Sequence, residues 1–322
     1  MSSTSEALVL EQFALRQQER WPVRWRRNLW RFITTKPLGA FGAAIVILFL
    51  LMAIAPQLFY TQNPNPSPNP ILERLQGPSA AHWFGTDQFG RDVYSRIVYG
   101  ARTSIIIGFL VVFVSAAIAS VVGTVSGYFG GWLDMILQRV VDVGIALPGL
   151  IFIILVVTTL TNFPPAFIAD PMHLSPSGKV VFRIAVALGF LVAFGSSRVI
   201  RGAAISAKQN MYVEAARVVG ATDARIIAKH IFPNVFAVVL VSASIQIGGA
   251  ILTESALSFL GYGVQPPTPS WGRMLNEARE QLTRHPHLAI FPGLAIFLAV
   301  YSFNMLGDAL RDVLDPRLRG SR

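Results

Sequence analysis

Long stretches without charge dominate the pattern of this chain of 322 residues. Six of them approach or exceed the roughly 20 residues that an α-helix needs to cross a bilayer. They cover residues 38–60, 103–127, 140–160, 180–200, 235–261 and 288–306. The fourth is the weakest, because its strictly uncharged part is only 184–197, but five companions favour a membrane helix there too. The pattern predicts an all-α integral membrane protein with six transmembrane helices.

The placement of lysine and arginine predicts the orientation of these helices. Basic residues collect before the first span (Arg16, Arg20, Arg24, Arg26, Arg27, Arg31, Lys36), around the connection from the fourth to the fifth (Arg198, Arg201, Lys208, Arg217, Arg225, Lys229) and after the sixth (Arg311, Arg317, Arg319, Arg322). Loops rich in Lys and Arg stay in the cytoplasm. Six spans place all three regions on that side, so both termini are predicted to be cytoplasmic.

This orientation divides the chain into consecutive parts. We expect a cytoplasmic tail (1–37), a first span (38–60), an extracytoplasmic loop (61–102), a core with the other five spans (103–309) and a cytoplasmic tail (310–322). The core contains a large cytoplasmic loop, 201–233, between the fourth and fifth spans.

Composition narrows the class of protein. Hydrophobic residues make up 53% and charged residues only 14%, against roughly a quarter charged in a soluble domain. The net charge is +10, and the basic residues lie at the ends of the apolar runs. This placement indicates contact with a membrane surface rather than binding of nucleic acid. The chain has no cysteine, and its five histidines show no metal-ligand spacing, so neither a thiol nor a metal site is expected. Without a phosphate-binding loop or a catalytic constellation, the chain is expected to hydrolyse no ATP and to carry no catalytic residue or cofactor.

The most informative segment reads MYVEAARVVGATDARIIAKHIFPN, at 211–234. Residues 212–219 suit a short helix, and Gly220 is able to end it in a left-handed conformation. A second helix is predicted over 223–230, and Pro233 marks the entry to the fifth span. The prediction is a helix-turn-helix that lies along the membrane surface.

This segment resembles the cytoplasmic signature of ABC importer permeases, which is Glu-Ala-Ala, then Gly, then a distal Pro. The matching positions are Glu214, Ala215, Ala216, Gly220 and Pro233, whereas His230 stands where many members have Ile. The resemblance implies that the loop couples the helices to an ATP-hydrolysing subunit, with Arg217, Asp223 and Arg225 among the contacts. A loop that merely rests on lipid headgroups is the alternative.

A second segment, WFGTDQFGRD at 83–92, precedes the second span. It is similar to the same region of the dipeptide, oligopeptide and nickel permeases, in the subunit type with a long N-terminal arm. LTESALSFLGYG at 252–263, PSWGRM at 269–274 and GDALRDVLDP at 307–316 extend the resemblance. Asp87, Arg91 and Asp92 are candidates for an extracytoplasmic docking or interface site. They bind either one another or a docking protein, and a segment that only anchors the chain at the membrane interface is an equal alternative.

Two residues inside predicted spans also carry expectations. Pro148 is expected to kink the third helix. Glu254 is an ionisable group within the fifth span, and such groups are costly unless they are paired or face water. It either lines a pathway or gate at a subunit interface, or it serves inside the protein in an ion pair or in hydrogen-bonded helix packing.

The resemblance implies an importer that works by alternating access in the cytoplasmic (inner) membrane of a bacterium or archaeon. The implied partners are a homologous second permease, two ATP-binding subunits that carry ATP and Mg, and an extracytoplasmic substrate-binding protein. Di- or oligopeptides are the implied cargo, with nickel, glutathione or oligosaccharide as alternatives. Two alternatives come from other functional classes. The first is an ion-coupled secondary transporter, and the second is a channel or structural membrane subunit. Glu254 is the only strong candidate for the intramembrane charges that ion coupling needs.

Overall fold

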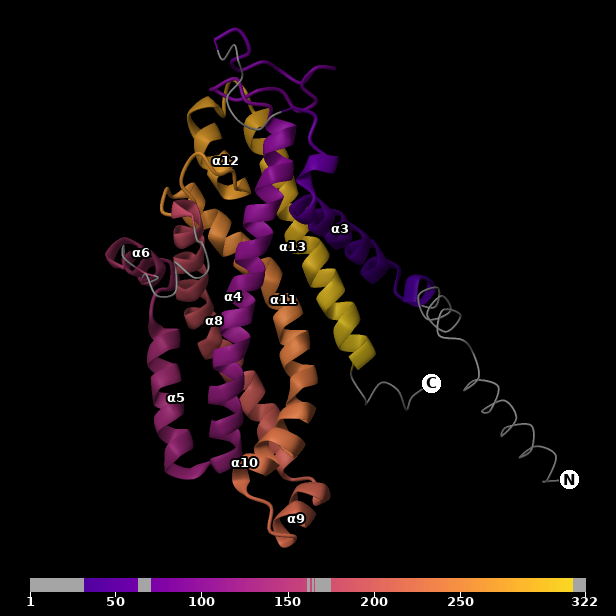
Figure 1. Ribbon diagram of the computed structural model, residues 1–322, viewed down its shortest axis with the longest axis vertical. Coiled ribbons are helices and arrows are strands. Elements are labelled where there is room, and N and C mark those ends of the chain that lie inside the picture. Colours follow the sequence, from indigo (N-terminus) through magenta and orange to yellow (C-terminus); the bar gives the residue numbers. More distant parts are fainter. Residues whose placement is uncertain (1–31, 63–70, 161–162, 164, 166–174, 315–322) are drawn as a thin grey trace, which may run out of the picture.

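The computed structural model describes residues 32–62, 71–160, 163, 165 and 175–314 (Figure 1). The helices are α3 (Pro37–Ile54), α4 (Val93–Phe129), α5 (Gly131–Ala146), α6 (Gly149–Thr159), α8 (Pro176–Lys208), α9 (Met211–Val218), α10 (Asp223–Ile226), α11 (Phe232–Phe259), α12 (Trp271–Ala278) and α13 (His287–Leu314). Short turns at Pro56–Leu58, Ile227–Ile231 and Arg279–Gln281 complete them. The described residues contain no β-strand, and the predicted all-α fold is confirmed. Most of the basic residues predicted for the two tails lie outside the described residues.

The helices are long and apolar enough for an integral membrane protein. Five segments satisfy the requirements for a span on their own: α3, α4, α8, the continuous stretch Asp223–Phe259, and His287–Asp312 of α13. The pair α5 and α6 makes a sixth candidate, but its two halves are bent by 90°. The described residues therefore hold five to six spans, in agreement with the apolar pattern of the sequence.

The bend between α5 and α6 lies at Pro148. Leu147 and Pro148 both have extended backbone angles, and α6 starts directly after them. Proline has no backbone N–H and its ring clashes with the preceding turn, so α5 does not continue through this position. The predicted kink is thus a complete break, after which α6 turns away from the axis of α5 (Figure 1).

Two helices begin earlier than the apolar runs suggest. The helix α4 starts at Val93 rather than near residue 103, and α5 starts at Gly131 rather than near residue 140. Both additional stretches contain charges, and one charge in each is paired with a residue far along the chain: Arg96 binds carboxylates, and Asp134 binds Arg201 through both guanidinium nitrogens Nε and Nη2, at 2.7 and 2.5 Å. A hydropathy pattern shows where a charged residue lies, but it does not show whether another residue pairs with that charge.

The predicted second helix of the helix-turn-helix does not end before the fifth span. The short α10, the π-helical turn Ile227–Ile231 and α11 follow one another as one continuous helix. Phe232 donates its N–H to the carbonyl of Ile227, five residues back, and Pro233, which has no N–H to donate, follows directly after this π-helical turn. Only α9 is therefore a separate helix in this loop.

Glycines bring α4 and α8 into close contact. A Cβ atom on Gly123 would lie 2.6 Å from the carbonyl oxygen of Ser197, and one on Gly127 would lie 2.7 Å from that of Arg201. Small residues at such positions let membrane helices pack backbone to backbone. The two longest described helices thus form one closely packed pair, with α11 and α13 beside them (Figure 1).

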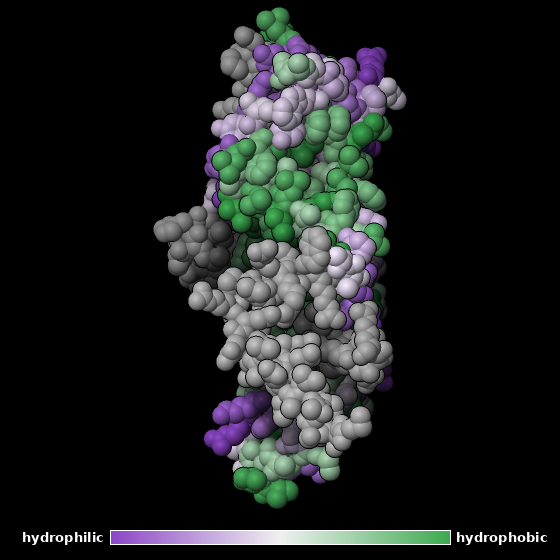
Figure 2. Space-filling model, turned by 90° about the vertical axis from the view of Figure 1, so that its right-hand side faces the viewer, coloured by the Kyte–Doolittle hydropathy of each residue, from purple (hydrophilic) through white to green (hydrophobic). Residues whose placement is uncertain are grey.

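The surface separates into zones along the length of the molecule. Figure 2 shows hydrophilic residues over one end, a hydrophobic zone below them, and a hydrophobic tip at the other end. The hydrophilic end lies at the level of α12, and the tip lies at the level of α9 (Figure 1). The hydrophobic zone suits contact with lipid, whereas the tip belongs to the loop that the sequence singled out.

Candidate functional site

The loop at 209–222 turns on Gly220. This residue has a positive φ of 85°, as predicted for a left-handed helix terminator. Gly220 N donates to the Arg217 carbonyl at 2.9 Å, and Ala221 N donates to the Ala216 carbonyl at 3.0 Å. This pair of bonds is the Schellman motif, which satisfies carbonyls at a helix C-terminus. The backbone conformation of Gly220 therefore fixes the direction in which the chain leaves α9.

Tyr128, at the end of α4, anchors the loop to the helix bundle. Its hydroxyl donates to Asp223 Oδ1 at 2.6 Å, and its carbonyl accepts from Lys208 Nζ at 2.6 Å. The guanidinium of Arg217 lies over the ring, 5.7 Å from its centroid. A side-chain hydrogen bond to Tyr128 raises the pKa of Arg217 above its usual range. On the inner side of α9, Val213 is fully buried and packs in one hydrophobic cluster with residues of the helix bundle.

The opposite face of α9 is exposed and largely apolar. Met211 is 89% exposed, and Val218 and Val219 are each 87% exposed. Glu214 and Ala215 are exposed on the same short helix, whereas Ala216 is half-buried. Arg225 and Pro233 are exposed on the continuous helix that follows. The residues of the predicted signature therefore lie on a projecting helix and in the segment that follows it. The loop exposes both charged and apolar side chains.

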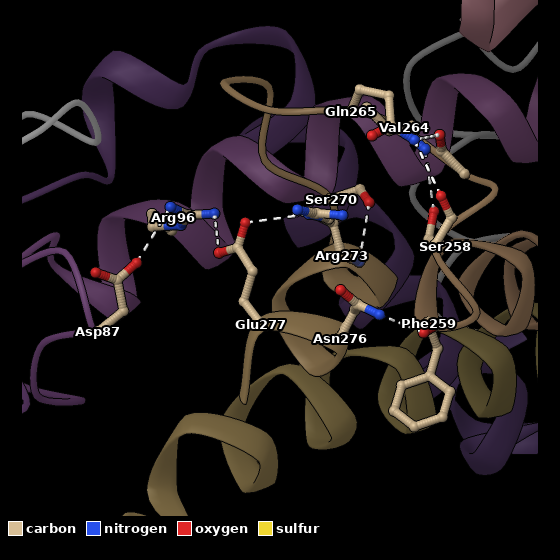
Figure 3. Close-up of polar contacts among 12 residues, drawn as sticks. Asp87, Arg96, Ser258, Phe259, Val264, Gln265, Ser270, Arg273, Asn276 and Glu277 are labelled. Atoms are coloured by element: carbon tan, nitrogen blue, oxygen red, sulfur yellow. Dashed lines mark hydrogen bonds and ion pairs between the residues drawn. The ribbon is translucent and has the colours of Figure 1, made fainter. Parts of the chain in front are cut away.

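The other end of the bundle contains a buried set of ion pairs, called here the outer network: Asp87, Arg91, Arg96, Arg273 and Glu277. Arg91 Nε lies 2.7 Å from Asp87 Oδ2, and its Nη2 lies 2.8 Å from Glu277 Oε2. Arg96 bridges the same two carboxylates at 3.2 and 3.0 Å, and Arg273 binds Glu277 at 3.2 Å (Figure 3). The outer network therefore joins the start of α4 to α12, which lies far along the chain.

Asp92 does not belong to the outer network. It accepts a hydrogen bond from Ser95 N at 2.8 Å and so caps the N-terminus of α4, where a carboxylate also meets the favourable end of the helix dipole. Its other oxygen lies 3.0 Å from His82 Nδ1. Asp87, Arg91 and Asp92 are each less than a tenth exposed. All three therefore contact neighbours within this chain, and a docking protein would meet the surface above them.

The comparisons with known proteins agree with this geometry. The family described as "Binding-protein-dependent transport system inner membrane component" matches residues 119–320, which include the loop 201–233. The glutathione transport system permease protein GsiD of Pectobacterium atrosepticum is 42% identical over 303 residues, which cover 93% of this chain and 92% of the relative. The chain belongs to this family of ABC importer permeases.

Two further relatives span the same length. The dipeptide transport system permease protein DppC of Alkalihalophilus pseudofirmus is 39% identical over 294 residues, covering 91% of this chain and 90% of the relative. GsiD of Escherichia coli O157:H7 is 39% identical over 302 residues, covering 91% of both chains. The permease is therefore a transport subunit of the inner membrane, of the type that the segment at 83–92 indicated.

Glu254 of this permease lies inside the protein. Its side chain is completely buried in α11, and Ser258 Oγ donates to its Oε1 at 2.6 Å. Ser258 Oγ also accepts from Val264 N at 3.3 Å, which connects the carboxyl to the loop after α11. The second carboxylate oxygen of Glu254, Oε2, has no hydrogen-bond partner in the described part of the chain. This position favours the internal packing role over a group that lines a path.

Four residues of these sites were not singled out from the sequence. Tyr128 gave no signal, because an aromatic residue at the end of a span is common in membrane proteins. Arg273 and Glu277 stand four residues apart, a spacing that suits an ion pair on one helix turn. Arg96 lies about two helix turns before the second predicted span, where a cation is typical of an anchor at the membrane interface. Partners separated by 181 residues, such as Arg96 and Glu277, leave no trace in a local pattern.

Proposed function

We propose that this permease imports small peptides as part of an ATP-driven complex, and that its α9 is the surface which an ATP-hydrolysing subunit engages. The observation that carries the proposal is the form of the loop. Its apolar residues Met211, Val218 and Val219 project beyond the bundle, while Val213 and Asp223 secure its base. An exposed apolar surface at a water-facing end of a membrane protein suits a protein partner rather than solvent.

The loop is built to pass motion to the bundle. In the proposed cycle, ATP draws two hydrolysing subunits together, and each carries a bound coupling helix with it. Tyr128 transfers this displacement to α4, because its hydroxyl holds Asp223 of the loop. ATP then stabilises the outward-facing state more than the inward-facing one, and hydrolysis reverses the preference.

The remaining assembly follows from the family. We propose a second homologous permease, two ATP-binding subunits and an extracytoplasmic substrate-binding protein as partners, with the coupling loop (201–233) on the cytoplasmic side. The relatives are named for dipeptide and for glutathione transport. Both substrates are short peptides with free carboxylates, so a small peptide is the proposed cargo. Glu214, Arg217 and Arg225 supply the charged contacts to the hydrolysing subunit.

The test is co-purification of the permease complex from native membranes with a Val218→Asp variant. A carboxylate at this exposed position should not disturb the bundle, but it should be desolvated at the interface and reduce recovery of the ATP-hydrolysing subunit about tenfold. Val218→Ile is the matched control and should recover the subunit normally. If both variants bring down the same amount of the subunit, or if no such subunit accompanies the unmodified permease, α9 is not the contact surface.

A further inference from the structure

A cavity of about 470 Å³ lies at the end of the bundle opposite the coupling loop. Three distant parts of the chain form it: the early turns of α4, the first turns of α8 and the loop that precedes α12. Its walls are mainly apolar, with contributions from Tyr99, Ile106, Leu110, Val181, Phe182 and Pro269. Cavities of 300–1,000 Å³ with such walls and few polar groups are typical of sites for small molecules.

Among the described residues that line this cavity, Arg102 is the only charged one. It is exposed, and it makes no hydrogen bond or ion pair with any residue that the structure describes. The outer network differs in this respect, because Arg91, Arg96 and Arg273 all bind carboxylates of the chain itself. Hydroxyl groups of Thr103, Ser177 and Thr268 share the lining. The cavity thus offers one unpaired cation, several hydrogen-bonding groups and an apolar wall.

We propose that this cavity is a substrate subsite of the permease, in which Arg102 binds the free carboxylate of a small peptide. The planar guanidinium matches a carboxylate through two parallel hydrogen bonds, and the apolar wall accommodates the peptide's side chains. Below the cavity, the same face of α4 stays uncovered in this chain at Phe109, Phe113, Ala117 and Val121. The subsite therefore opens onto a continuous wall that runs toward the coupling loop.

A lipid phosphate is the competing partner for an arginine near a membrane surface. Two features favour the peptide. The guanidinium belongs to a concave site formed by three segments, and the hydroxyl groups suit the amide groups of a peptide. The assignment rests on the proposed peptide import, so the experiment must separate failure of the subsite from failure of that function.

The first experiment compares uptake of labelled trialanine and trialanine amide by cells with the complete importer. Because the extracytoplasmic binding protein is the same in every strain, a change in the ratio of the two uptake rates arises from the permease. Arg102→Gln should lower the preference for the free carboxylate about fivefold or more, and Arg102→Lys should retain most of it. Arg284→Gln is the control, because Arg284 is an exposed arginine outside this cavity.

The second experiment uses the absence of cysteine from the chain. Ser177→Cys places a single thiol in the wall of the cavity, which a membrane-impermeant maleimide should label in the assembled importer. Trialanine should slow this labelling several-fold more than trialanine amide does. In the Ser177→Cys, Arg102→Gln double variant the two peptides should protect equally.

The results separate the possibilities. An unchanged uptake ratio in Arg102→Gln overturns the subsite, and so does an equal loss of both rates, which would assign Arg102 to lipid anchoring or assembly. Equal protection by both peptides in the Ser177→Cys single variant also overturns it. If the unmodified importer takes up neither peptide, the proposed function itself fails.

Discussion

Gly220 sets the direction of α9 through a backbone conformation that side chains disfavour. An ideal Cβ at this position would meet no other atom within 4 Å, so the cost of a substitution comes from the backbone alone. Gly220→Ala should destabilise the turn by about 1–2 kcal/mol. We expect slower peptide uptake at unchanged membrane insertion, measured in cells by labelled-peptide uptake and by immunoblot of the membrane fraction.

A matched control exists within α8. Gly202 is exposed and also has free space around a Cβ atom, but its backbone is helical. Gly202→Ala should therefore leave uptake unchanged, because alanine favours a helix more than glycine does. Equal loss of uptake in both variants would contradict the importance of the left-handed turn.

Glu277 gives the outer network its second carboxylate. It accepts hydrogen bonds from three arginines, and its side chain is only 10% exposed. Glu277→Ala leaves three arginines of the outer network with Asp87 as their one remaining carboxylate and should cost about 3–5 kcal/mol. The measurement is the thermal unfolding of the detergent-solubilised permease complex. Glu280→Ala, at an exposed position close by, should leave the unfolding temperature unchanged.

At the scale of single residues, the sequence predicted backbone conformation better than it predicted which side chains contact each other. Gly220 and Pro148 act as expected because glycine and proline restrict their own backbone in any context. Glu254 was visible as a buried charge, but its serine partner and its inward direction depend on tertiary packing. Arg96 binds Glu277, which lies on another helix, α12, and no local rule connects the two.

At the scale of elements, the pairing of α4 with α8 depends on the absence of side chains along one seam. Gly127→Ala would place a Cβ atom within 2.7 Å of the Arg201 carbonyl oxygen, which cannot rotate away. The helices must separate, at a cost of about 1–3 kcal/mol or more. Lower thermal stability of the solubilised complex is the expected result.

The control for this variant lies on α8 itself. Gly195→Ala adds the same methyl group where no atom lies within 4 Å, and it should leave the unfolding temperature as it is. A similar loss in both variants would show that helix content rather than the seam sets the stability.

The elements themselves were predictable because apolar length alone identifies a membrane helix. Their ends were not, because charged residues such as Arg96 and Asp134 continue a helix when partners elsewhere neutralise them. The path of the chain through Ile227–Ile231 was also missed, since a π-helical turn lets the helix pass Pro233 without interruption.

At the scale of the whole molecule, the uncovered face of α4 should change its accessibility during transport. Ala117 is exposed on this face, about four turns below Arg102. In the complete importer, Ala117→Cys should react several-fold faster with a membrane-impermeant maleimide when ATP and vanadate hold the hydrolysing subunits closed. Thr283→Cys, in an exposed loop, should react equally in both states. Identical rates at Ala117→Cys with and without nucleotide would contradict alternating access along this wall.

The length of α4 has a mechanical consequence. Its 37 residues form a rod of about 55 Å, pinned to the coupling loop by Tyr128 at one end and to α12 by Arg96 at the other. Such a rod amplifies small rotations: a tilt of about 5° about one end displaces the other by about 5 Å over that length. In the proposed cycle, the hydrolysing subunits therefore need to shift the loop only slightly to move the far end of α4 by roughly the breadth of a peptide chain.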